Sequence, residues 1–592
     1  MNLKLAKLSS IATGVAIGIA AMSAQAAEQP TLPTAGASTG AIFTGGATIN
    51  DGASFLKAVP AAEAADLVAT IKPASEDVGK MGGLIVVAEV PGLGLFNLVS
   101  GGAWVPLANV ANVQPFMTKT LEASEAITIL DNLVGESANV AGTSISAFVG
   151  YYTNNDMSTL TYSASPAVLA ISNSVAPGCP ANTQLFQGAT FQGKPACVLS
   201  GRITSDTHLT SNNTYLLQGQ VIIGENTVSG AKTQLTIDAG TTIFNTGGVH
   251  LLVIDRNGQI QANGSAAKPI IFTYEGDATA TPDTRGQWGG IVINGSARIN
   301  EAGGVAQGEG ASGEYGGTND EDSSGSMTYV QVKYAGRVFT ESDELNGIAF
   351  QGVGSGTNVD FVQVHNNSDD GVEFYGGTVN AKHLFLTGNE DDSIDWTQGW
   401  SGKVQYAAVR MGSSADHCIE ADNNADNNDA TPRSNPTISN LTCAGGFNDD
   451  GQGVRLREGT SATITNSVIS NFSSYCVDID QAATFNNAGG SIAGLNGNLV
   501  LRNSRVSEGC GFSASSGDIF SVADWYAAQI GSGTGTDLGG TLGLTNGSIL
   551  NAVQAENSLA SDPFFDQVDY VGAIKDSSSD WSAGWTFRDF VQ

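Results

Sequence analysis

The chain has 592 residues, with 57 Asp and Glu against 25 Lys and Arg, and a formal net charge of −32. Hydrophobic residues make up 41% of the chain, enough for a substantial core, which excludes a disordered acidic tail. The 75 glycines indicate many tight turns, but without a Gly-X-Y period they exclude a collagen. The acidic balance argues against nucleic acid and anionic membrane surfaces as partners, because both attract patches of Lys and Arg.

The first 26 residues are typical of a signal peptide. Lys4 and Lys7 precede an apolar run over 11–22, and Ala24-Gln25-Ala26 resembles a cleavage site. Removing residues 1–26 deletes two lysines and no acids, so the mature net charge would be −34. No later apolar run is long enough for a transmembrane segment. We therefore expect export to the outer cell surface or the extracellular space of a Gram-negative bacterium.

Six cysteines agree with export. An even number of cysteines in an exported chain indicates disulfides. The sequence contains no C-x-x-C motif, which argues against a zinc ribbon. Six cysteines allow fifteen pairings, of which pairing between sequence neighbours is the simplest. The predicted bonds are Cys179–Cys197, Cys418–Cys443 and Cys476–Cys510.

The N-terminal third reads as a linker followed by a small β-rich domain. Residues 27–52 are small and polar, which is typical of a linker. Residues 53–175 contain short β-like runs separated by Gly and Asn, which predict a β-sandwich-like domain. Residues 61–69 are predicted to form a short helix. This domain shows no catalytic constellation and is expected to be a structural or binding module.

The rest of the chain repeats. Six anchor segments have second residues spaced by 24, 22, 25, 35 and 23 positions: 347–350, 371–374, 393–396, 418–421, 453–456 and 476–479. A period near 23 with short strands in each repeat predicts a parallel β-helix over 176–592. Alternation within the anchors should turn Val372 and Phe374 inward. A C-terminal cap is expected over about 511–592, with a helix at 518–530 and with Trp581, Trp585 and Phe587 covering the last coil.

Four segments carry a family resemblance: 235–273, 286–300, 346–364 and 371–386. They resemble secreted bacterial proteins with the right-handed parallel β-helix of the pectin-lyase-like superfold. The resemblance implies a mainly β fold and a surface or extracellular setting. It implies no settled activity.

Stacked repeats would place acidic residues on one strip, at the outward anchor position and in the turn before each anchor. The predicted metal ligands are Asp370, Glu373, Asp391, Asp392, Asp395, Asp416 and Glu420. Unit charges about 4.8 Å apart repel by about 1 kcal/mol in water, so bound Ca²⁺ is a predicted cofactor. Turn capping is the alternative for the paired aspartates, although it explains the in-strand acids poorly, since acids are depleted in strands.

A second interpretation makes the strip an active site. Polygalacturonase-type enzymes carry Asn-x-Asp, Asp-Asp, Gly-His-Gly and Arg-x-Lys motifs on successive coils. This chain is similar in offering, in the same order, Asn367-Ser368-Asp369, Asp391-Asp392, His417 and Arg455-Leu456-Arg457. Asp416 and Cys418 flank His417 in place of glycines, and the second basic residue is Arg.

Two functions therefore stand open. The leading one is an acidic surface protein that binds Ca²⁺ and an extracellular glycan or matrix. The alternative is a polysaccharide hydrolase or lyase, with Asp369, Asp391, Asp392, His417 and Arg455 as its catalytic candidates. Carboxylates on adjacent or alternate coils have the spacing that glycosidases use. The sequence leaves the oligomeric state open.

Overall fold

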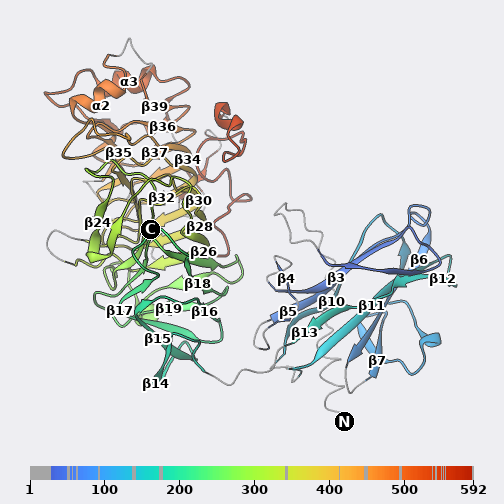
Figure 1. Cartoon of the computed structure of the whole chain (residues 1–592). Helices are drawn as coiled ribbons and strands as arrows, with labels where there is room; N and C mark the ends of the chain where they lie inside the picture. The colour runs from blue at the N-terminus through green and yellow to red at the C-terminus, as the bar shows by residue number, and fades with distance from the viewer. Residues whose placement is uncertain are drawn as a thin grey trace. The chain divides into compact units, whose positions relative to one another are not determined.

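A computed structural model describes residues 29–589, except 50–53, 57, 60, 62–63, 91–93, 136–139, 141, 172–177, 340–343, 413, 446–450, 492–496, 536–537, 540–542, 548–549, 551–552 and 554 (Figure 1). The predicted signal peptide, 1–26, lies outside the described residues. The chain divides into two compact units between Gly178 and Cys179. Among the described helices, none has the length and apolar character needed to cross a membrane.

The N-terminal unit is a β-sandwich-like pair of antiparallel sheets, as predicted. One sheet has the order β1-β3-β5-β10 with β4 beside β3, and the other has the order β2-β12-β11-β6-β7-β8 with β13 and β9 beside β11 and β6. Its elements are β1 (Thr31–Leu32), β2 (Thr34–Gly36), β3 (Ile42–Ile49), β4 (Ser54–Leu56), β5 (Ala64–Lys72), β6 (Met81–Val90), β7 (Gly94–Val99), β8 (Ala103–Pro106), the 3-10 turn η1 (Val110–Asn112), β9 (Met117–Thr120), β10 (Glu125–Val134), β11 (Ser144–Thr153), β12 (Asp156–Ser163) and β13 (Ala167–Ala170).

Two sequence predictions in this unit were wrong. The predicted linker at 27–52 contributes strands β1 to β3, because Phe43 and Ala47 are buried in the sandwich core despite the small polar residues around them. The predicted helix at 61–69 overlaps strand β5. Its buried residues alternate with less buried ones at a period of two, which is the period of a strand and not of a helix.

The second unit is a parallel β-helix, which confirms the predicted fold. Twenty-seven of its described strands form one continuous sheet, parallel except for the first hairpin, β14–β15. The strands are β14 (Gln184–Phe191), β15 (Lys194–Ile203), β16 (Thr207–Leu209), β17 (Thr214–Ile223), β18 (Thr233–Ile237), β19 (Thr242–Phe244), β20 (Leu251–Ile254), β21 (Gly258–Asn263), β22 (Ile270–Phe272), β23 (Gly290–Asn294), β26 (Gly325–Lys333), β27 (Ile348–Gln351), β28 (Asn358–His365), β29 (Val372–Tyr375), β30 (Asn380–Thr387), β31 (Ile394–Thr397), β32 (Lys403–Arg410), β33 (His417–Ala421), β34 (Thr437–Ala444), β35 (Gln452–Leu456), β36 (Ala462–Thr465), β37 (Val468–Ser470), β38 (Tyr475–Ile479), β39 (Leu499–Arg502), β40 (Arg505–Val506), β41 (Gly511–Phe512) and β42 (Gly533–Thr534).

Short elements lie outside this sheet. They are two antiparallel hairpins, β24–β25 and β43–β44, and several short helices. They are η2 (Asp277–Thr279), β24 (Ala306–Gly308), η3 (Glu309–Ala311), β25 (Gly313–Tyr315), α2 (Ala482–Asn487), α3 (Val522–Ala528), β43 (Leu538–Gly539), β44 (Thr545–Asn546) and η6 (Ser558–Ser561).

Inward side chains stack from coil to coil and form the core. Val372 pairs in register with Ile394, and Phe374 with Trp396, and all four side chains are fully buried, as the alternation predicted. All three predicted disulfides are present: Cys179–Cys197, Cys418–Cys443 and Cys476–Cys510. The second bond joins neighbouring coils, with its Cα atoms 6.0 Å apart.

Five long strands, β26, β28, β30, β32 and β34, bend at a residue with left-handed backbone. These residues have φ between 49° and 64°: Tyr329, Phe361, His383, Tyr406 and Asn440. The rings of the first four residues stack in this order, with neighbouring centroids 4.4, 4.1 and 4.8 Å apart. A left-handed non-glycine residue costs about 1–3 kcal/mol, which the ring stacking helps to offset.

The C-terminal region differs in part from the predicted cap. Helix α3 packs against β38 and buries Trp525 and Tyr526, although it is shorter than the predicted 518–530. Trp581, Trp585 and Phe587 were expected over the last coil, and this was wrong. They belong to a segment, residues 556–589, that lies along the flank of the β-helix, where Trp585 contacts the Tyr329 and Phe361 rings (Figure 1). We call this segment the C-terminal strap.

Candidate functional site

A column of charged residues runs up one outer face of the β-helix. Strands β27, β29, β31, β33 and β35 pair in parallel, so that Glu373, Asp395, Glu420 and Arg455 occupy the same position on successive coils. Ala349 precedes the column and Asp478 follows it, also in register. The outward position of the repeat is therefore acidic on three consecutive coils and then becomes basic.

Turn residues join this column to form three compact groups. In each group, one ligand atom of every member lies within 4.8 Å of the others. The groups are Glu344–Asp369–Asp391, Asp370–Glu373–Asp395 and Asp392–His417–Glu420. We call these nine residues the acidic strip. Sequence reasoning missed Glu344, which stands three residues before the 347–350 anchor and not directly before it, where later repeats carry their paired aspartates.

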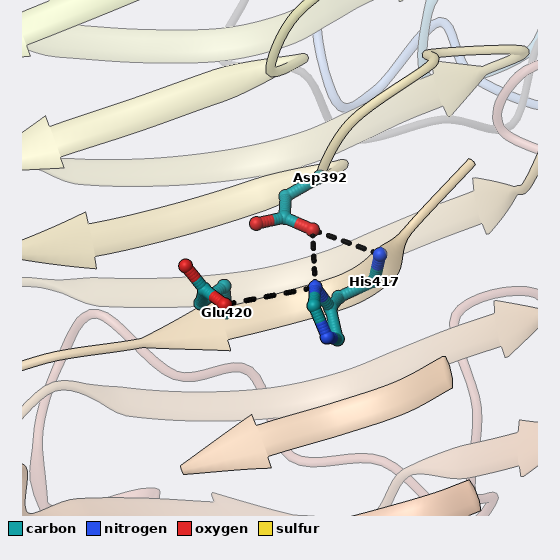
Figure 2. Close-up of side chains that lie close together, drawn as sticks. All are labelled: Asp392, His417 and Glu420. Atoms are coloured by element: carbon teal, nitrogen blue, oxygen red, sulfur yellow. Dashed lines mark hydrogen bonds and ion pairs between the residues drawn. The ribbon is translucent and has the colours of Figure 1, made fainter. Parts of the chain in front are cut away.

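The group Asp392–His417–Glu420 is held by internal hydrogen bonds (Figure 2). Oδ1 of Asp392 lies 2.8 Å from Nδ1 of His417 and accepts the His417 backbone N–H at 2.8 Å. Glu420 Oε1 lies 3.7 Å from the same ring nitrogen. Burial lowers the pKa of His417, and in the tautomer that carries its proton on Nδ1 the ring donates to Asp392.

Two arginines compensate the charge of this last group. Arg457 pairs with Glu420, and its Nε lies 2.8 Å from Asp422. Arg455 Nη1 lies 3.5 Å from Glu420, and its Nη2 lies 3.3 Å from Asp480. This end of the strip is therefore an ion-pair network as well as a carboxylate cluster.

The members of the group Asp370–Glu373–Asp395 form no ion pair among the described residues, and Arg457 offsets only part of the charge of Asp395. Asp370 Oδ1 accepts the Asp392 backbone N–H at 3.0 Å, and Glu373 Oε2 accepts Asn346 Nδ2–H at 2.7 Å. Oδ1 of Asp395 is buried without a hydrogen-bond partner in the described structure, and so is Oδ1 of Asn346. Burial, followed by repulsion from neighbouring carboxylates, raises the pKa of all three acids well above the ordinary range.

The group Glu344–Asp369–Asp391 also lacks an ion pair among the described residues, although Arg457 lowers the pKa of Asp391 in part. Asp369 is buried, and burial together with repulsion from Glu309 and Asp391 raises its pKa to about 8. Burial and the nearby Asp416 raise the pKa of Asp391. Among the ion pairs of the described residues, none involves a member of this group or of Asp370–Glu373–Asp395.

The predicted site residues are therefore divided among separate groups of side chains. Asp369 lies with Asp391, while Asp392 lies with His417, so the five catalytic candidates are in the expected order but do not form one cluster. Arg455 contacts Glu420 and is separated from Asp369 by two intervening coils. Asp416 is not a member of the three groups, but its Oδ2 lies 3.6 Å from His417 Nδ1, and its side chain is 52% exposed.

Oxygen atoms dominate the donor set of the strip. Ca²⁺ takes 6–8 oxygen ligands and prefers carboxylates and amide carbonyls, so it fits Asp370, Glu373 and Asp395 with the unpartnered oxygen of Asn346 nearby. The Asp392 group fits less well, because its imidazole N–H is already directed at Asp392.

The fold and the strip define an acidic parallel β-helix protein. Residues 201–586 match the family described as the pectate-lyase-like beta helix domain, and the chain belongs to this family. A search of curated proteins finds no match. Among solved structures, the catalytic unit of a thermostable α-1,3-glucanase of glycoside hydrolase family 87 from Streptomyces thermodiastaticus is 12% identical, with 86% of this chain and 97% of that chain covered and a TM-score of 0.21. At that TM-score the likeness carries no argument about function.

Proposed function

We propose that the chain is an exported protein that binds Ca²⁺ in the acidic strip and holds an extracellular polysaccharide through that site. The observation that carries the proposal is the group Asp370–Glu373–Asp395, in which two buried carboxylates and the partly buried Asp395 lie close together and form no ion pair with a described cationic residue. Burying an unpaired carboxylate is costly. The group must therefore take up protons or bind a cation.

Charge favours a divalent cation over protons alone as the physiological partner. Asp395 Oδ1 and Asn346 Oδ1 are buried without partners, and a proton shared among the carboxylates would satisfy at most one of these two acceptors. A Ca²⁺ ion accepts several oxygens at once and neutralises two charges. Asp370 and Glu373 are already oriented by the Asp392 amide and by Asn346, so their positions are fixed before any ion binds.

The polysaccharide part of the proposal rests on the family, and the charge of the chain explains why binding should need the ion. The family description names pectate lyase, and the strip lies on an outer face of the β-helix. A formal net charge of −32 would repel an anionic glycan. Bound Ca²⁺ would cancel part of that repulsion at the strip, so glycan binding should require the ion.

A glycan array with the mature chain tests this proposal, in millimolar Ca²⁺ and again in EDTA. We expect binding to at least one acidic polysaccharide in Ca²⁺ and its loss in EDTA. Asp395→Asn should abolish the Ca²⁺-dependent binding. Glu508→Gln, an acid-to-amide change at an exposed position away from the strip, is the matched control. Binding that is equal in EDTA and Ca²⁺, or no binding at all, would contradict the polysaccharide role.

A second function is favoured by one observation, the contact between Asp369 and Asp391. Their ligand oxygens lie within 4.8 Å of each other, near the spacing of about 5 Å between the carboxyl groups of retaining glycosidases. A carboxyl with a pKa of about 8, such as Asp369, is protonated at neutral pH and suits a general acid. This hypothesis predicts release of reducing ends from a polysaccharide, abolished by Asp391→Asn with glycan binding retained.

A further inference from the structure

The N-terminal β-sandwich carries an apolar hollow on the outer face of its second sheet. The hollow has a volume of about 400 Å³, within the range of small-molecule pockets. Its lining is apolar apart from one tyrosine hydroxyl: Ile85, Val87, Leu95, Val110, Val113, Phe148, Val149, Gly150, Leu160 and Tyr162. Among the described residues, no charged side chain lines it.

The strand register explains the floor of the hollow. Gly150 of β11 pairs with Ile85 of β6 on one side and with Tyr162 of β12 on the other. The missing side chain at Gly150 lets Tyr162 approach β11 closely, because a Cβ at this position would lie 2.9 Å from Tyr162 Cβ. Phe148 pairs with Val87 in the next row on the same face and extends the apolar floor.

The roof is a loop that a buried amide fixes in place. Asn97, which is 1% exposed, donates to the Gln114 carbonyl at 3.0 Å and to the Val86 carbonyl at 3.1 Å, and it accepts the Gln114 N–H at 2.7 Å. The 3-10 turn η1, just before Gln114, carries Val110, which is 67% exposed. The hollow is therefore preformed, and it is not a chance gap under a loose loop.

We propose that this hollow binds a small uncharged apolar molecule, with an alkyl chain or an aromatic ring as the bound part. The lining offers no counter-charge to an ion and little hydrogen bonding to a sugar. Its volume of about 400 Å³ is in the range of small-molecule pockets, whereas a stable protein interface needs an extended surface of about 800 Å² per partner. Exposed apolar side chains such as Val110 and Tyr162 are then explained as the rim of a binding site.

The test uses the mature full-length chain and N-phenyl-1-naphthylamine, a neutral apolar dye whose fluorescence rises out of water. We expect saturable binding of one dye per chain, displaced by dodecanol. Val113→Asp places a charge in the roof, and Val87→Trp fills the floor. Each should weaken dye binding at least tenfold, while Val168→Asp, at an exposed valine of the same sheet outside the hollow, should change it less than twofold.

Circular dichroism and thermal unfolding of each variant show whether it is folded, and two separate substitutions guard against one misfolded variant. Dye binding that does not saturate, or that both lining variants leave intact, would overturn the proposal. So would a wild-type dimer that Val113→Asp converts to a monomer without any dye binding, since the face would then be an interface between copies.

Discussion

Asp392 and His417, on neighbouring coils of the β-helix, share two short contacts through one oxygen atom. Oδ1 of Asp392 lies 2.8 Å from the His417 backbone nitrogen and 2.8 Å from its Nδ1. The carboxylate thereby fixes the start of β33, the strand that carries Glu420. Asp392 therefore helps to position β33. Asp395 makes no such contact through Oδ1, which has no hydrogen-bond partner in the described structure.

This relationship predicts different effects for two substitutions at Asp392. Asp392→Asn keeps an acceptor oxygen and should cost less than about 1 kcal/mol of stability. Asp392→Ala leaves two buried N–H donors of His417 without a partner and should cost about 2–4 kcal/mol. Urea unfolding of both variants in EDTA measures the difference. Equal losses for the two variants would show that the hydrogen bonds to His417 are not what holds the turn.

The metal-free protein should lose stability as the pH rises from 5 to 8. Burial and mutual repulsion raise the pKa of Asp369 to about 8, and they raise the pKa values of Asp370, Glu373 and Asp395. A carboxyl with a raised pKa binds more protons in the folded than in the unfolded state, so its contribution is present at low pH and is lost as pH rises through the folded pKa. Melting temperatures in EDTA across this range check the slope.

Saturating Ca²⁺ should flatten that slope, because the ion takes the place of the protons that are lost. Asp369→Asn should flatten it without metal, since one of the titrating groups is removed. A metal-free protein that is equally stable at pH 5 and pH 8 would show that ionisation of these acids does not destabilise the folded state.

The disulfide beside the strip should stabilise both the fold and the site. Cys418 follows His417 directly, and its bond to Cys443 closes a span of 25 residues between neighbouring coils. Replacing both cysteines with alanine should cost about 3 kcal/mol, mainly by freeing the unfolded chain. It should also weaken Ca²⁺ binding less than Asp395→Asn does, because β33 carries only the arginine-compensated end of the strip. Denaturant unfolding and Ca²⁺ titration measure the two effects.

The C-terminal strap should contribute strongly to the stability of the β-helix. The Trp585 ring is 2% exposed and meets the Tyr329 and Phe361 rings edge-on at 5.5 and 6.1 Å. The backbone of Phe587 exchanges two hydrogen bonds with the side-chain amide of Gln363. Trp585→Ala should therefore cost about 3–5 kcal/mol. Phe564→Ala, at a less buried strap residue, is the comparison, and thermal unfolding that shows equal small losses would exclude a stabilising strap.

The repeat spacing was sufficient to predict the parallel β-helix, the inward stacking of Val372 and Phe374, and the disulfide across neighbouring coils. Each of these follows from one regularity, because residues at equal positions in successive coils must lie above one another. The acids of the column could be placed in order for the same reason.

Other features depend on contacts that repeat spacing does not encode. Glu344 joins the strip from the turn between β26 and β27, three residues before its anchor and not directly before it as in the later repeats, so the repeat spacing does not mark it. The ion pairs of Arg455 and Arg457 depend on where their long side chains point, and repeat spacing gives only the positions of the backbone. The packing of Trp585 in the strap on Tyr329 joins residues more than 250 positions apart, and no local pattern indicates such a pairing.

Calorimetric titration of the metal-free mature chain with Ca²⁺ at neutral pH tests the central claim most directly. We predict a saturable isotherm, with proton release that grows as the pH falls, because the ion competes with protons for the same carboxylates. Asp395→Asn should lower the affinity at least tenfold and raise the melting temperature in EDTA, while Glu508→Gln should change neither. An isotherm without binding heat at two temperatures, together with melting curves that are identical in Ca²⁺ and EDTA, would contradict the account.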